Sequence, residues 1–272
     1  MTSTSLLRAS DELLAEMRRR APLVHCITNL VVNNFTANVL LAAGASPAMI
    51  PDPGEAGVFA GIASALLVNV GTVTPELADA MRAAVAGARA AGRPWVLDPV
   101  AVGALPLRTN LSRELLATPP AIIRGNASEI PALAGEAVTN RGTDATQGVE
   151  AAAGAARRLA AQTGGAVLVT GPTDLAVGPD GREARIGGGT PLLTRVTGVG
   201  CAQGAICAAF CAAADGDAFL AAVASALLFA VAGERAEKVS SRPGSFQIAL
   251  LDAFDAIAPG DFSAEGSVHV IR

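Results

Sequence analysis

The chain alternates short, continuous apolar runs with longer stretches whose apolar residues recur at helical spacing. Short runs of this kind are typical of strands buried on both faces of a sheet. Strands are predicted over residues 23–27, 46–50, 65–70, 94–98, 121–124 and 166–170, and helices over residues 6–20, 33–43, 55–63, 74–91, 111–116 and 146–162, with a further helix opening near residue 126. Strands that alternate with helices indicate an α/β fold, in which a mainly parallel central sheet carries helices on both faces.

The pattern changes in the last third of the chain. Two short strands, over residues 174–177 and 183–186, are joined by a Pro-Asp-Gly turn and predict a small antiparallel hairpin at the edge of the sheet. Apolar helices follow, one of them over residues 218–233, and the last predicted helix is amphipathic and covers residues 246–257. No repeat or linker separates these parts, so we expect residues 1–272 to form one domain.

The composition does not alter the predicted fold, but it argues against several classes of protein. The mean hydropathy is +0.44, but the longest nearly apolar run, residues 218–233, is shorter than the roughly 20 residues that cross a bilayer, so we predict a buried helix and no membrane partner. A net charge of −4 and 3% aromatic residues argue against nucleic-acid binding. The first helix carries Asp11, Glu12 and Glu16 and lacks the apolar core of a signal peptide, so we expect a cytoplasmic protein.

The metal-binding residue types are few. The chain has two histidines and four cysteines, with no Cys-x-x-Cys pair, which argues against a zinc site. Any metal ion is therefore expected to be held by oxygen ligands.

The stretch over residues 194–209 is the strongest local signal. β-branched residues lead into Gly198 and Gly200, and small residues at helical spacing follow, which predicts a strand, a tight turn and the start of a helix. Amides at such a helix start bind anions, and Cys201 in the first turn is expected to favour the thiolate. The arrangement suits phosphoryl transfer. It also fits a simple connecting turn with Cys201 in the core, and it matches neither a Walker A loop nor a dinucleotide fingerprint.

Polar or glycine residues repeatedly follow the apolar runs. Because ligands bind beyond the carboxyl ends of the strands in an open α/β sheet, we expect these residues to share one site. They are Asn29, Gly71, Asp98, Arg124, Asn126 and Thr170.

Each candidate has a plain alternative. Asn126 and Glu129, one helical turn apart, could bind a hydrated Mg²⁺ or merely cap a helix. Asp98 could join the ion through water, or pack as a strand-end carboxylate. Arg124 could hold polyphosphate, or pair with one of the two acids.

Two further side chains belong with them. Thr170 could donate a hydrogen bond to a phosphate, or serve only as a strand residue. Met49 could pack on a flat apolar substrate, or lie in the core.

Taken together, the ordered motifs resemble the hydroxyethylthiazole kinases of thiamine salvage, within the ribokinase-like superfamily. The resemblance covers nearly the whole chain and runs through residues 24–29, 33–38, 44–49, 97–100, 123–130, 196–201 and 244–247. It implies a ribokinase-like fold and ATP-dependent phosphorylation of 4-methyl-5-(2-hydroxyethyl)thiazole with Mg²⁺. It also implies a homotrimer whose sites are shared between neighbouring subunits.

The resemblance carries roles onto matching residues. It implies that Met49 and Gly198 contact the thiazole and that Asn29 and Gly71 line the same pocket. It implies that Cys201 occupies the catalytic position where most ribokinase-like enzymes carry an aspartate. The positions implied for ATP are Arg124, Thr170, Asn126 and Gly200, and those implied for the metal are Glu129 and Asp98.

Three other functions remain open on sequence grounds. They are another ribokinase-like vitamin kinase that acts on hydroxymethylpyrimidine, a lyase that dehydrates a hydrated nicotinamide nucleotide, and a non-catalytic sensor. Met49, Asn29 and Cys201 favour the thiazole over the pyrimidine. ATP consumption that depends on added thiazole separates all four.

Overall fold

A computed structural model describes residues 1–136 and 148–272. Within these residues the strands form one nine-stranded sheet in the order β2-β1-β3-β4-β5-β6-β7-β8-β9. The pairs from β2 to β6 are parallel, and the pairs from β6 to β9 are antiparallel. The strands are β1 (Leu23–Ile27), β2 (Ser46–Ala48), β3 (Ala65–Asn69), β4 (Trp95–Asp98), β5 (Ile122–Asn126), β6 (Ala166–Thr170), β7 (Asp174–Val177), β8 (Glu183–Gly187) and β9 (Ser267–Val270). The predicted parallel sheet with an antiparallel edge is confirmed, whereas a single domain for the whole chain stays a prediction.

The strands are apolar on both faces because each face packs against its own layer of helices. In β3, Ala65 and Leu67 belong to one hydrophobic cluster, and Leu66 and Val68 belong to the other. This alternation follows from the two-residue period of a strand, and it explains why the strand sequence is continuously apolar.

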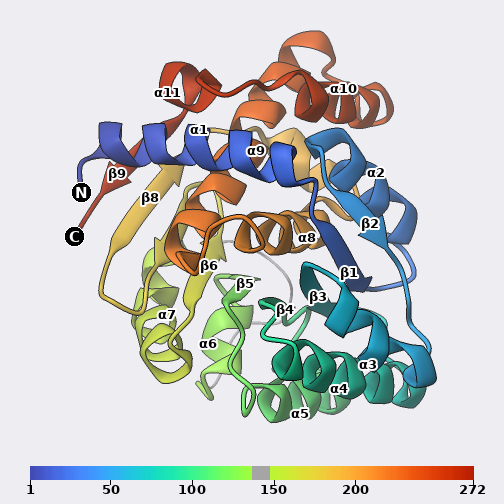
Figure 1. The fold of residues 1–272 in the computed structure, drawn as a ribbon. Coiled ribbons are helices and arrows are strands. Elements are labelled where there is room, and N and C mark those ends of the chain that lie inside the picture. The colour runs from blue at the N-terminus through green and yellow to red at the C-terminus, as the bar shows by residue number, and fades with distance from the viewer. Residues whose placement is uncertain (137–147) are drawn as a thin grey trace.

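The two helical layers lie above and below the sheet in Figure 1. The upper layer is formed by α1 (Ser3–Arg20), α2 (Asn33–Ala43), α8 (Val199–Cys211), α9 (Ala218–Val239), α10 (Pro243–Ala256) and α11 (Asp261–Glu265). The lower layer is formed by α3 (Pro53–Ile62), α4 (Pro75–Ala90), α5 (Pro106–Leu115), α6 (Glu129–Leu133) and α7 (Val149–Thr163). The predicted start of α7 at residue 146 lies outside the described residues.

Helix α9 lies in the centre of the upper layer (Figure 1). It has 22 residues, more than the predicted apolar run, and it is the one described helix long and apolar enough to cross a membrane. However, 72% of its apolar window is buried inside the protein. We therefore interpret α9 as a core helix, in agreement with the predicted burial.

Three local predictions are wrong, and two short elements were not predicted. Helix α5 begins at Pro106 and not at residue 111. The segment before Gly198 is not a strand but a 3₁₀ helix (Pro191–Arg195), because Pro191 suits a first helical position and the Thr190 side chain caps it. Strand β2 stops at Ala48 instead of residue 50, since the Ile50 carbonyl accepts a hydrogen bond from the His25 ring. Helix α11 and edge strand β9 were not predicted, because both are short and carry no strong period.

Candidate functional site

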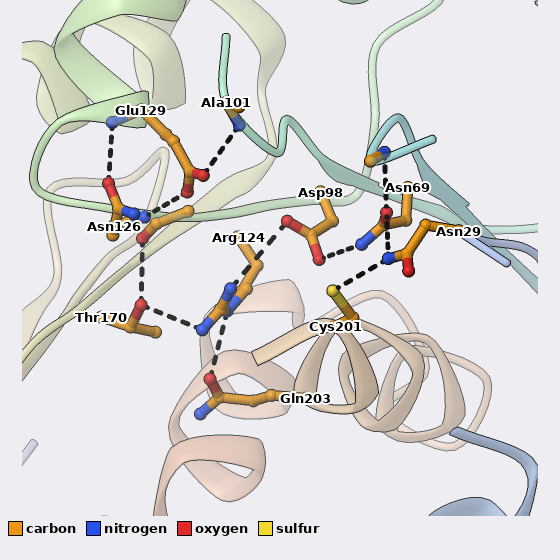
Figure 2. Close-up of polar contacts among 12 residues, drawn as sticks. Asn29, Asn69, Asp98, Ala101, Arg124, Asn126, Glu129, Thr170, Cys201 and Gln203 are labelled. Atoms are coloured by element: carbon orange, nitrogen blue, oxygen red, sulfur yellow. Dashed lines mark hydrogen bonds and ion pairs between the residues drawn. The ribbon is translucent and has the colours of Figure 1, made fainter. Parts of the chain in front are cut away.

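The polar strand ends meet at one edge of the sheet, facing the first turn of α8. Figure 2 shows side chains from the ends of β1, β3, β4, β5 and β6 converging on Cys201 and Gln203 of α8. The fold therefore brings together the residues that were predicted to share one site at the carboxyl ends of the strands.

Helix α8 begins at a position that requires glycine. Gly198 has φ 90°, and a Cβ there would lie 2.8 Å from Cγ1 of Val32. The first helical hydrogen bond is donated by the Ala202 amide to the Gly198 carbonyl. The amides of the preceding residues consequently have no intrahelical acceptor, and such amides, together with the helix dipole, favour the binding of an anion.

Arg124 lies beside this helix start. Its Nη2 donates to Oγ1 of Thr170 at 3.0 Å, and its Nε donates to Oε1 of Gln203 at 3.2 Å. A Cβ at Gly200 would lie 2.9 Å from Nη2, so the glycine provides the space that the guanidinium occupies. Burial opposes the charge, but the carboxylates of Asp98 and Glu129 outweigh it and raise the pKa of Arg124.

A cavity of about 610 Å³ extends from Arg124 and Gly200. Its lining also includes apolar side chains, among them Leu193 and Phe229. A cavity lined by a cation and by apolar side chains suits a ligand that has both an anionic group and a flat or apolar part.

A neutral hydrogen-bonded network lies on the other side of Asp98 (Figure 2). Nδ2 of Asn29 lies 3.2 Å from Sγ of Cys201 and 3.1 Å from Oδ1 of Asn69, and it donates to both. The Gly71 amide donates to the same Asn69 oxygen at 3.0 Å. A Cβ at Gly71 would lie 2.9 Å from Asn29, so this glycine also provides space. The structure thus brings Asn29, Gly71 and Cys201 together, as their strand-end positions indicated.

The predicted thiolate at Cys201 is wrong. Burial and the neighbouring Asp98 carboxylate raise the pKa of Cys201 to about 11, although Asn69, Arg124 and Asn29 act in the opposite direction. The helix start therefore does not ionise the thiol, because the thiol is largely removed from solvent and lies near the Asp98 carboxylate.

Asp98 is fully buried, with 0% exposure. Its Oδ2 accepts a hydrogen bond from Nδ2 of Asn69 at 2.6 Å. Its Oδ1 lies 3.9 Å from Nη1 of Arg124 and has no hydrogen-bond partner among the described residues. Burial raises the pKa of Asp98 to about 7 against the effect of Arg124. A buried carboxylate oxygen without a donor is rare in folded proteins and calls for a functional explanation.

Asn126 and Glu129 hold the start of α6. Oδ1 of Asn126 accepts hydrogen bonds from the Ser128 amide, the Ser128 hydroxyl and the Glu129 amide. Oε1 of Glu129 accepts from the Ala101 amide at 3.0 Å, and Oε2 accepts from the Asn126 amide at 2.9 Å. Asn126 therefore satisfies amides at the start of α6, as the helix-cap alternative expected, although the N-cap position itself is Ser128, and its oxygen is fully engaged.

These contacts bear on the predicted magnesium ion. The described residues contain no group of three His, Cys, Asp or Glu side chains that could enclose a metal. The free Oδ1 of Asp98 and the singly bonded oxygens of Glu129 suit an ion that takes one or two carboxylates and keeps its waters. The residues present fit hydrated Mg²⁺ better than a caged metal.

Met49 is not part of the hydrogen-bonded group. It follows β2, is half-buried and packs against the upper core, and its role against a substrate stays a prediction.

Sequence reasoning missed three polar residues of the site. Asn69 stood out only as a polar residue inside an otherwise apolar run, and Gln203 stood one helical turn from Gly200. Asp174 was assigned only to the hairpin, yet it lines the cavity and accepts from the Gly171 amide at 2.9 Å, and burial raises its pKa to about 6.

Comparison with known proteins shows the family of this chain. A family model described as the hydroxyethylthiazole kinase family matches residues 14–259. The chain belongs to this family. A hydroxyethylthiazole kinase of Cronobacter sakazakii is 55% identical over 247 residues, which cover 91% of this chain and 92% of the relative. A hydroxyethylthiazole kinase of Cereibacter sphaeroides is 53% identical, with coverage of 90% and 93%.

Solved structures agree with the family. A hydroxyethylthiazole kinase protein from Pyrococcus horikoshii superposes with a TM-score of 0.88 at 35% identity, covering 97% of this chain and 99% of that chain. A pyridoxal kinase from Staphylococcus aureus, solved with AMP-PCP and pyridoxal, superposes with a TM-score of 0.62 at 15% identity, covering 91% and 97%. At that identity the second likeness shows the fold alone. The predicted ribokinase-like fold and the predicted membership of a kinase family are confirmed.

Proposed function

We propose that this chain phosphorylates the hydroxyethyl group of 4-methyl-5-(2-hydroxyethyl)thiazole with ATP in thiamine salvage. The observation that carries the proposal is the family match over residues 14–259, which includes the anion site of α8 and the buried Arg124 beside it. The fold alone would not select the substrate, since one fold hosts many reactions.

On the nucleotide side, we assign the phosphates of ATP to Arg124, Thr170 and the amides around Gly200. In a loose phosphoryl-transfer transition state, catalysis rests on positioning and on neutralising charge. Arg124 is preorganised for this task because Thr170 and Gln203 already hold its guanidinium. The Asn126 side chain lines the same cavity and is assigned a contact with ATP.

We assign Asp98 and Glu129 as the protein ligands of Mg²⁺, directly or through water. When bound, the ion would add positive charge beside the phosphates. The protein contributes the unpartnered Oδ1 of Asp98 and the backbone-anchored carboxylate of Glu129.

On the acceptor side, we assign the thiazole to Met49, Gly198, Asn29 and Gly71. Cys201 would lie beside the hydroxyl as a neutral thiol, because its pKa is raised to about 11. Its contribution is then contact and position in preference to proton abstraction as a thiolate.

We further propose a cytoplasmic homotrimer with its sites at subunit interfaces. Support comes from the exposed apolar side chains of Leu30, Val31 and Leu41, next to and on α2, and of Val58 and Ile62 on α3. Light scattering on the purified protein tests the trimer, and a monomeric mass would contradict it.

The reaction is tested by ADP release from Mg²⁺-ATP alone, with the thiazole, and with hydroxymethylpyrimidine. Release that requires the thiazole, with a phosphorylated thiazole identified by mass spectrometry, is the expected result. Release that requires the pyrimidine would overturn the substrate assignment. ATP binding without release in any mixture would favour the lyase or the sensor.

The nucleotide assignment is tested by Arg124→Ala. We expect the KM for ATP to rise by about 100-fold, because a buried charge-assisted contact to phosphate is lost. Arg82→Ala is the control, since Arg82 forms exposed ion pairs with Asp79 and Glu114 that contribute little. An unchanged KM for ATP in Arg124→Ala would place the phosphates elsewhere.

A further inference from the structure

We propose that Asn69 is a positioning residue that links the side of the site assigned to the thiazole, with Asn29 and Gly71, to its charged side, with Asp98 and Arg124. The oxygen of its side-chain amide holds Asn29 and the Gly71 backbone, and the nitrogen of the same amide holds Asp98. The assignment rests on the proposed function and adds a residue to it.

The place of Asn69 follows from strand register. It is the last residue of β3 and pairs with Asp98 of β4 in the parallel ladder. Neighbouring strands lie about 4.8 Å apart, so two side chains in register on one face contact each other directly. Asn69 is 1% exposed, so its amide must find its partners inside the protein.

The partners of the amide fix its orientation. Oδ1 accepts from Nδ2 of Asn29 at 3.1 Å and from the Gly71 amide at 3.0 Å, while Nδ2 donates to Oδ2 of Asp98 at 2.6 Å. Exchanging the oxygen and the nitrogen would oppose donors to donors and an acceptor to the carboxylate. The amide therefore has one satisfactory orientation, as Figure 2 shows.

This orientation decides which atoms of Asn29 and Asp98 remain available to their other neighbours. Because Asn69 accepts from Asn29, the same Asn29 nitrogen also reaches Cys201. Because Asn69 occupies Oδ2 of Asp98, it is the other oxygen, Oδ1, that faces Arg124 and stays free. A side chain that served only to join β3 to β4 would duplicate the backbone ladder already present there.

Asn69→Asp separates the contacts made by the amide oxygen from the contact made by the amide nitrogen. The acid keeps the shape and the acceptor toward Asn29 and Gly71, but it replaces the donor to Asp98 with a second carboxylate. We expect the KM for the thiazole to stay within about 3-fold of wild type while kcat falls by about 30-fold, since two adjoining buried carboxyl groups cannot both ionise and therefore share a proton. This sharing changes the charge and the position of Asp98, and small displacements in a site are costly. Asn69→Leu removes the hydrogen bonds of both the amide oxygen and the amide nitrogen. We expect its kcat to fall as far as that of Asn69→Asp and its KM for the thiazole to rise by about 10-fold.

Controls keep the result specific. Asn110→Asp adds the same charge at an exposed position on α5, and we expect wild-type constants. Circular dichroism and thermal melting report whether each variant is folded. If Asn69→Asp does not fold, Asn69→Ser replaces it, and its shorter side chain predicts a loss in kcat together with a rise in the thiazole KM.

The outcomes are distinct. Both constants within about 3-fold of wild type in a folded Asn69 variant would overturn the assignment, as would a raised thiazole KM with unchanged kcat in Asn69→Asp. Wild-type protein that releases no ADP with the thiazole would instead overturn the proposed function, and the assignment with it.

Discussion

Two buried aspartates show how differently this fold treats a carboxylate. Asp11, on α1, is 6% exposed, and its oxygens accept from the amides of Gly260, Phe262 and Ser263 and from the Ser263 hydroxyl. Asp98, at the end of β4, is 0% exposed and receives one hydrogen bond, from Asn69, with Arg124 at 3.9 Å.

The difference is the one expected between a carboxylate that holds the fold together and one that is proposed to act in a site. Asp11 satisfies the first amides of α11 and so fixes the C-terminal region onto α1, as a helix cap does. Oδ1 of Asp98 has no hydrogen-bond donor among the described residues and lies 3.9 Å from Nη1 of Arg124. The satisfied oxygens of Asp11 therefore favour a structural role, whereas the unsatisfied oxygen of Asp98 supports the role proposed for it in the site.

The largest expected effect is on catalysis at Asp98. We expect Asp98→Asn to lower kcat by roughly 1000-fold, because the charge that we propose helps to hold a phosphate-bound cation is lost. The melting temperature should stay equal or rise, since an incompletely satisfied buried charge is removed. Steady-state kinetics and calorimetry check both, and a variant with kcat near wild type would remove Asp98 from the site.

The second expected effect is on the pH dependence of stability. Because the pKa of Asp98 is raised to about 7 by burial, the folded state holds this proton more tightly than the unfolded chain. The contribution of Asp98 to stability is therefore present at low pH and is lost as the pH rises from about 4 to about 7, at up to roughly 1.4 kcal/mol per pH unit.

Urea titrations of wild type and Asp98→Asn across this pH range, without nucleotide or metal, measure the effect. The stability of the variant relative to wild type should increase with pH up to about 7 and then level off. A difference that does not change with pH would show that Asp98 titrates alike in both states.

The third expected effect is on stability at Asp11. We expect Asp11→Ala to lower the free energy of unfolding by about 3 kcal/mol, because one buried and three partly buried donors at the start of α11 lose their acceptor. The kinetic constants at a temperature where the variant is folded should match wild type. A changed kcat in folded Asp11→Ala would contradict a purely structural role for Asp11.

The smallest expected effect is at Cys201, the neighbour of Asp98. Since the thiol stays protonated with a pKa of about 11, Cys201→Ser should keep kcat within about 10-fold of wild type. The rate between pH 7 and 9 should show no step caused by this thiol. An inactive serine variant with normal ATP affinity would identify Cys201 as an obligatory base.

Particular residues show how far the sequence led. Continuous apolar runs predicted the parallel strands, and the rule for strand ends gathered Asn29, Asp98, Arg124 and Thr170 at one edge. Asn69 and Gln203 were passed over, since a polar residue inside an apolar stretch has the same appearance whether it is tolerated or functional. The 3₁₀ helix before Gly198 was missed because local spacing could not weigh the cap at Thr190 against β-branched residues.

The sequence by itself determined the alternation of strands and helices up to the hairpin, the glycine turn at the start of α8 and the family resemblance, because these depend on local period and on ordered motifs. Only the tertiary structure decided the state of the groups in the site. Burial keeps Cys201 a thiol, the register of β3 and β4 joins Asn69 to Asp98, and Asn126 is engaged as a cap. The physical reason is that hydrogen-bond partners and desolvation depend on residues distant in the chain, which no local pattern records.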